Sequence, residues 1–144
     1  MAPPPALGFT ADVAADLATT GARVREALGA EGFGVVSEID LQATLRAKLE
    51  VEMPGFRILG ACSPVLAHRA VMADPTVGLL LPCKVVVREV EGGTRVELVD
   101  PVVLLGPIDN PVLAQVGRDA QGLMRRVVVA LTTATTHFGA AGSG

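Results

Sequence analysis

Cys62, His68 and Cys83 carry the side chains best suited to chemistry in this sequence, and all three lie between residues 57 and 87. Cys62 ends a run of strand-forming residues and directly precedes Ser63 and Pro64, a pair that typically begins a helix. The N-terminus of a helix favours negative charge and can lower the pKa of a thiol. Cys62 is therefore the candidate catalytic residue, as a reactive thiolate in redox or sulfur chemistry.

The two cysteines also fit a packed core, because a free cysteine is among the residue types most often buried. Strand alternation predicts that both point inward together with neighbouring apolar residues, which are Phe56, Ile58, Val85 and Val87. We therefore expect this stretch to be mainly core with an accessible rim. The candidate ligand-binding residues are Cys62, Ser63, His68 and Cys83. A disulfide between the two cysteines would require Cα atoms within about 7 Å.

A metal site is not expected from these residues. Cys62, Cys83 and His68 would supply three ligands, whereas a structural zinc site is closed by four. Glu38 or Asp40 could complete the set only by coincidence of folding, so we predict no metal and no cofactor. The glycine patterns that bind nucleotide phosphates and the Gly-x-Ser-x-Gly motif of hydrolases are absent.

Composition excludes several classes of function. The net charge is −3, with no Trp or Tyr and four Phe, so the basic surface and stacking aromatics of nucleic-acid binders are missing. No apolar run approaches the ~20 residues that cross a bilayer, and the sequence MAPPPALGFTADV does not resemble a signal peptide. Two cysteines without an export signal predict a cytoplasmic protein with reduced thiols.

Periodicity predicts a first half that alternates between strands and helices. Strands are expected at residues 6–10 and 33–39, and a helix capped by Thr10 or Asp12 lies between them, ending at Gly29 or Gly32. Asp40 is expected to cap a second helix. The apolar stripes of these two helices are Val13, Leu17, Val24 and Leu28, and then Leu41, Leu45 and Leu49.

In the second half of the sequence, the same patterns predict a strand at 56–62, an alanine-rich helix at 64–73 and a hairpin. In the hairpin, Gly92 and Gly93 form a two-residue loop that places Arg88 opposite Glu97. A short helix starts at residues 100–101, and a long helix starts at residues 110–111. The long helix has the apolar stripe Leu113, Val116, Ala120, Leu123, Val127, Leu131 and Ala134.

Together these elements predict an α+β fold in which a mostly antiparallel sheet is packed by helices on one face. We expect a single domain at residues 6–137, a flexible N-terminus at 1–5 and a disordered tail at 138–144. His137, close to that tail, is not expected to have a role.

Three blocks, GFGVVSEID, FRILGACSP and DPTVGLLLPCKVVV, occur in this order and at separations that resemble the DUF302 family, which has the TT1751-like fold. The resemblance extends from about residue 6 to residue 137. It implies a curved antiparallel sheet backed by helices and a homodimer, and it supplies neither an established activity nor catalytic residues. Family members often have Asn-Pro after the first cysteine, where this chain has Ser63 and Pro64.

Two functions from different classes follow. The leading hypothesis is a non-catalytic, dimeric domain that binds a small molecule or a partner protein, because half of the chain is hydrophobic and candidate chemistry is scarce. The alternative is a cysteine-dependent redox or sulfur-handling protein that uses Cys62.

Overall fold

The computed structural model describes the backbone of residues 6–142 and the side chains up to residue 133. The expected flexible segment 1–5, the side chain of His137 and the last two residues of the expected tail lie outside the described part. The elements, in chain order, are β1 (Gly8–Val13), α1 (Leu17–Ala30), β2 (Gly34–Asp40), α2 (Leu41–Leu49), β3 (Phe56–Cys62), α3 (Pro64–Ala73), the 3₁₀ helix η1 (Pro75–Leu79), β4 (Cys83–Val90), β5 (Gly93–Val99), α4 (Pro101–Leu105) and α5 (Pro111–Gly142).

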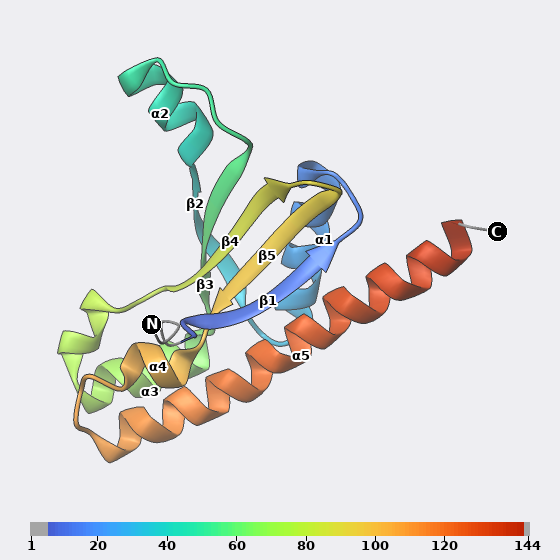
Figure 1. Ribbon diagram of the computed structural model, residues 1–144. Coiled ribbons are helices and arrows are strands. Elements are labelled where there is room, and N and C mark those ends of the chain that lie inside the picture. The colour runs from blue at the N-terminus through green and yellow to red at the C-terminus, as the bar shows by residue number, and fades with distance from the viewer. Residues whose placement is uncertain (1–5, 143–144) are drawn as a thin grey trace, which may run out of the picture.

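The strands form one five-stranded antiparallel sheet in the order β1-β5-β4-β3-β2. Helices α1 and α5 pack against the same face of this sheet, and α5 runs alongside β1 and continues beyond the body of the molecule (Figure 1). The α+β architecture predicted from the sequence is therefore confirmed.

The main core lies between the sheet and these two helices. Alternate residues of the strands point toward α1 and α5, as strand geometry requires. The residues that fill this core and are at most 2% exposed are Val13, Val24, Leu28, Leu59, Ala61, Val85, Val87, Val96, Leu98, Met124, Val127 and Leu131. Met124 takes a place in the core that the sequence pattern assigned to Leu123.

The start of α1 differs from the expectation. Val13 is the last residue of β1 and not part of the helix, and the Asp16 side chain accepts a hydrogen bond from the Thr19 amide at 2.8 Å. Asp16 is thus the N-cap, in place of Thr10 or Asp12. Val13 adopts the strand conformation and not the helical one because pairing with β5 extends along the whole of β1 and buries the Val13 side chain.

The hairpin register also differs from the expectation. The loop is formed by Glu91 and Gly92, and Gly93 already pairs with Val90 in the ladder. A Cβ atom at Gly93 would lie 2.3 Å from the carbonyl oxygen of Val13 on the neighbouring strand. The absence of a side chain at Gly93 therefore permits the close approach of β1. Sequence rules for hairpins consider only the two paired strands and do not include this third strand.

A second, smaller core lies at the end of the sheet where β3 ends and β4 begins. Helices α3 and α4, the 3₁₀ helix η1 and the first turns of α5 meet there (Figure 1). Its fully buried residues are Ala70, Val77, Leu105, Leu113 and Val116. The caps predicted for α3 and α4 hold, since the side chains of Ser63 and Asp100 accept hydrogen bonds from the amides of Leu66 and Val102.

Helix α2 projects away from the body at the opposite end of the sheet (Figure 1). Asp40 caps it as predicted, but none of its residues is buried, so the stripe of Leu41, Leu45 and Leu49 does not enter the core.

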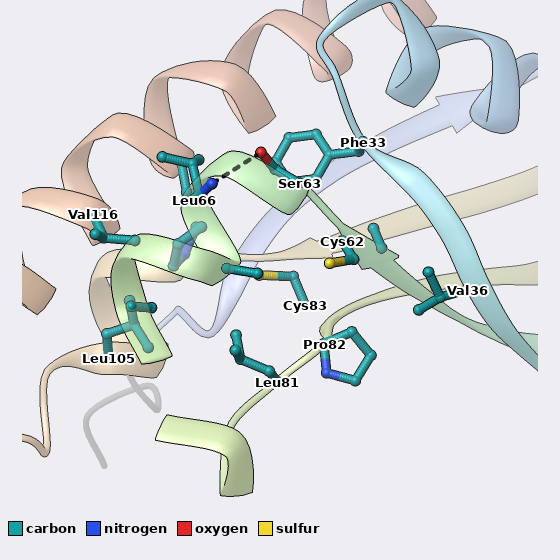
Figure 2. Close-up of a pocket in the computed structure, with 15 residues that line it drawn as sticks. Phe33, Val36, Cys62, Ser63, Leu66, Leu81, Pro82, Cys83, Leu105 and Val116 are labelled. Carbon is teal, nitrogen blue, oxygen red and sulfur yellow. Dashed lines mark hydrogen bonds between the residues drawn. The ribbon is translucent and has the colours of Figure 1, made fainter. Parts of the chain in front are cut away.

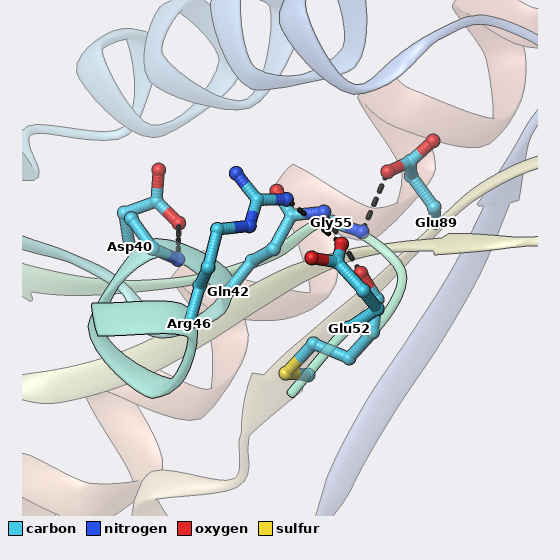
Figure 3. Close-up of polar contacts among 8 residues, drawn as sticks. Asp40, Gln42, Arg46, Glu52, Gly55 and Glu89 are labelled. Carbon is cyan, nitrogen blue, oxygen red and sulfur yellow. Dashed lines mark hydrogen bonds and ion pairs between the residues drawn. The ribbon is translucent and has the colours of Figure 1, made fainter. Parts of the chain in front are cut away.

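The segment between α2 and β3, which leads the chain back to the sheet, is held by polar contacts (Figure 3). Gln42 donates a hydrogen bond to the carbonyl of Met53 at 2.8 Å, and the Gly55 amide donates to the Glu89 carboxylate at 2.6 Å.

Candidate functional site: an apolar cavity beside the two cysteines

A cavity of about 270 Å³ lies between the two cores. Its walls come from β2, the end of β3, the start of β4, one side of α3 and parts of α4 and α5 (Figure 2). Residues far apart in the sequence therefore meet there, including Phe33, Leu66, Pro82, Leu105 and Val116.

Small side chains leave this space open. Ala67 and Ala70 of α3 and Ala120 of α5 all face the cavity. The alanine-rich side of α3 forms one wall of the cavity, and the larger Leu66 of the same helix and Leu105 of α4 also line it.

The two cysteines both line the cavity, but they have different environments. Cys83 is buried, with 9% of its surface exposed, as its inward position predicted, whereas Cys62 is only half-buried. In the β3–β4 ladder Cys83 lies opposite Ala61, the residue before Cys62. The sulfur atoms of both residues point into the space between the strand ends in Figure 2.

The predicted inward face of β3 was wrong by one residue. The side chains that share the inner face with Cys83, Val85 and Val87 belong to Arg57, Leu59 and Ala61, while Phe56 and Ile58 are half-buried on the opposite face. Both sets are largely apolar, so alternation alone does not distinguish them. Cys62 belongs to the opposite set and reaches the cavity because it is the last residue of β3, where the chain turns into α3.

Burial determines the chemistry of Cys83. Loss of solvent raises the pKa of this thiol to about 11; the neighbouring Cys62 adds to the rise, and Lys84 opposes it. Cys83 is therefore protonated at neutral pH and behaves as a small apolar residue with a weak donor.

Ser63 and His68 have different positions. Ser63 lines the cavity, but its hydroxyl oxygen accepts the Leu66 amide at 3.4 Å as the cap of α3. His68 is exposed on α3 and is not among the lining residues. Of the four candidate binding residues, the structure thus brings together Cys62, Ser63 and Cys83 and leaves His68 outside.

Charged side chains are absent from the wall of this cavity, within the part of the chain whose side chains are described. Over the same residues, no three His, Cys, Asp or Glu side chains are grouped so that they could hold a metal ion. The arrangement offers dispersion contacts and two thiols, so it suits an uncharged apolar molecule. Most of the lining residues were missed from the sequence, since they come from six separate elements and share no motif.

A family model described as a domain of unknown function, DUF302, matches residues 9–131. The crystal structure of an uncharacterized conserved DUF302 protein from Bacillus stearothermophilus is similar, with 30% sequence identity and a TM-score of 0.77 over 87% of this chain and 95% of that chain. No curated protein matches the chain. Within residues 6–142, no helix is both long and apolar enough to cross a membrane.

Proposed function

Since the chain belongs to the DUF302 family, a domain family of unknown function, we propose its function from the cavity. The protein is a non-catalytic domain that binds a small, uncharged, apolar molecule in this cavity. The observation that carries this proposal is the apolar wall of the cavity, in which the described side chains are interrupted only by two thiols and by the capping hydroxyl of Ser63. An ionised ligand group would lose its hydration there without gaining a partner.

The size of the cavity indicates the size of the ligand. A protein cavity of roughly 150 Å³ lined by apolar side chains holds a benzene molecule. The present cavity, at about 270 Å³, therefore suits a two-ring or ten-carbon molecule. Burying roughly 200 Å² of such a ligand at ~25 cal/mol per Å² contributes about 5 kcal/mol, which corresponds to a dissociation constant on the order of 0.2 mM.

The redox alternative, with Cys62 as a catalytic thiolate, has less support. A catalytic cysteine, which must react rapidly, typically lies beside a basic side chain or a metal, and no Lys, Arg or His is among the described residues of the cavity wall. His68, the histidine nearest in sequence, is exposed on α3 and outside the cavity.

Calorimetric titration with naphthalene as the probe tests the proposal. Wild-type protein should bind naphthalene at one site and should bind naphthalene-2-carboxylate at least tenfold more weakly, because the carboxylate must be desolvated. Ala67→Leu should abolish binding by filling the cavity from α3. Ala47→Leu on the exposed α2 makes the same chemical change outside the cavity and should leave binding intact. Equal binding by both variants would exclude the cavity as the site.

We also propose that the protein is located in the cytoplasm and forms a homodimer there. Large apolar side chains are exposed on several elements, among them Val36, Leu49 and Val129 at 65%, 64% and 62%. Such surface favours association between copies of a chain. Sedimentation at micromolar concentration should give the mass of two chains, and a monomer alone would contradict this proposal.

A further inference from the structure

The cavity contains both cysteines of the chain, and their positions in the sheet are close. Cys83 pairs with Ala61, so Cys62 is one residue along the neighbouring strand and belongs to the opposite face of the sheet. Its side chain reaches the same cavity as Cys83 because β3 ends at Cys62 and the chain turns there into α3. The spacing of paired antiparallel strands and the rise per residue place the Cα atoms of Cys62 and Cys83 about 6 Å apart. Disulfide-bonded cysteines usually have Cα atoms 4.4–6.8 Å apart, at roughly this separation.

The two thiols also differ in access. Cys62 is half-buried at the cavity wall, beside the largely exposed Val36, whereas Cys83 is buried behind it. An oxidant that enters from solvent reaches Cys62 first. Cys83 then lies within the same space as the oxidised sulfur (Figure 2).

We propose that Cys62 and Cys83 form a redox switch that closes the ligand cavity. This inference rests on the ligand site proposed above and adds a means of regulating it. A disulfide across the wall would join the end of β3 to the start of β4 and occupy space that an apolar ligand needs.

The reaction requires a peroxide as the oxidant. The Cys62 sulfur attacks one peroxide oxygen, the O–O bond breaks, and the products are a sulfenic acid and an alcohol or water. The Cys83 sulfur then attacks the Cys62 sulfur, its S–H proton leaves with the hydroxide as water, and the S–S bond forms. Two electrons pass from the sulfur pair to the peroxide, and a dithiol reductant reverses the change.

The burial of Cys83 makes the second step slow at neutral pH, because its thiol must lose a proton to attack. The high pKa of Cys83 therefore predicts that disulfide formation accelerates as pH rises toward about 11. The same burial protects Cys83 from direct oxidation, so the order of the two steps is fixed.

Intact mass spectrometry after treatment of the whole protein with hydrogen peroxide tests the disulfide. The expected product is a monomeric chain about 2 Da lighter in which neither cysteine reacts with maleimide after denaturation, and a dithiol should restore both reactions. Cys62→Ala should prevent the mass loss and leave Cys83 reduced, while Cys83→Ala should stop at an oxidised Cys62. A chain in which Cys62 gains two or three oxygens while Cys83 remains free, or a disulfide between two chains, would overturn the proposal.

Naphthalene titration of the same samples tests the closure. Oxidised wild type should bind at least fivefold more weakly than reduced wild type, whereas peroxide should not weaken binding by Cys83→Ala in this way. An intramolecular disulfide with unchanged naphthalene affinity would show that the switch does not close the cavity. Absence of naphthalene binding by the reduced protein would contradict the ligand-binding function itself, while the mass measurement would still decide whether the disulfide forms.

Discussion

Arg88 on β4 lies directly opposite Arg95 on β5, and each guanidinium is paired with a carboxylate elsewhere on the same face of the sheet. Arg88 donates to Glu97 at 2.6 Å, and Arg95 donates to Asp12 on β1 through two hydrogen bonds of 2.8 and 3.1 Å. The two carboxylates compensate the like charges that face each other, and the Arg95–Asp12 pair links the central hairpin to the edge strand.

The Asp12–Arg95 pair predicts a pH dependence of stability. The hydrogen bond from Arg95 holds the pKa of Asp12 below its usual 3.8. A carboxyl group whose pKa is lower in the folded state stabilises the fold above the unfolded pKa, and this contribution is lost as pH falls through the folded pKa. Asp12→Asn should therefore lower the free energy of unfolding near pH 7, with the deficit shrinking once the pH drops below 3.8.

Urea unfolding near pH 7 and near pH 3 measures this change. The effect should be small, because the pair lies at the surface. Glu91→Gln in the hairpin loop is the control, since Glu91 is exposed and forms no ion pair with the described residues. A deficit for Asp12→Asn that does not diminish in acid would show that packing or polarity, and not the ion pair, is responsible.

Gly55 is the point at which the projecting α2 segment returns to the sheet. Its amide donates to the Glu89 carboxylate, and the Glu89 amide donates to its carbonyl at 2.9 Å (Figure 3). A Cβ atom at Gly55 would lie 2.3 Å from Oε1 of Glu89 and 2.7 Å from Cδ2 of Leu17. The ends of these two side chains can move, so Gly55→Ala should destabilise the protein by about 0.5–1.5 kcal/mol, chiefly because the shifted Glu89 carboxylate loses its hydrogen bond from the Gly55 amide.

Thermal unfolding compares this variant with Gly21→Ala. Gly21 lies in α1, where an added Cβ atom meets nothing within 4 Å, so this substitution should stabilise the helix by about 0.5–1 kcal/mol. If both variants shift the melting temperature in the same direction, the close contact at Gly55 is not a constraint on the fold.

The different burial of the two cysteines predicts different responses to the same substitution. Cys83→Ser should destabilise the protein by about 1–3 kcal/mol, because it places a hydroxyl in an apolar wall. Cys62→Ser should cost less, since Cys62 is half-buried. In the native wild type, a maleimide should label Cys62 within the time in which Cys83 stays unlabelled. Faster labelling of Cys83 would contradict the assigned burial.

Local signals in the sequence predicted the parts of the fold that depend on neighbouring residues. Asp40, Ser63 and Asp100 each accept a hydrogen bond from an amide two or three residues later, so the starts of α2, α3 and α4 could be recognised from short patterns. The α+β class followed from the order of these elements.

Features that depend on distant contacts could not be predicted in this way. The position of Gly93 in the ladder depends on β1, which lies some 80 residues earlier in the chain. The face of β3 could not be assigned because Ile58 and Leu59 are both apolar and adjacent. The cavity is formed by small residues such as Ala67 and Ala120 on different helices, and only the packed fold shows that they meet.

A crystal structure of the wild-type protein grown with 1-bromonaphthalene, which carries an anomalous scatterer on a neutral two-ring molecule, tests most directly whether the cavity binds an apolar ligand. One bromine peak should lie inside the cavity, between Ala67 of α3 and Cys83 of β4, and it should be lost in Ala67→Leu. A cavity without bromine at saturating probe concentration, or a peak only on the exposed face of the sheet, would contradict the assignment of this cavity as the binding site.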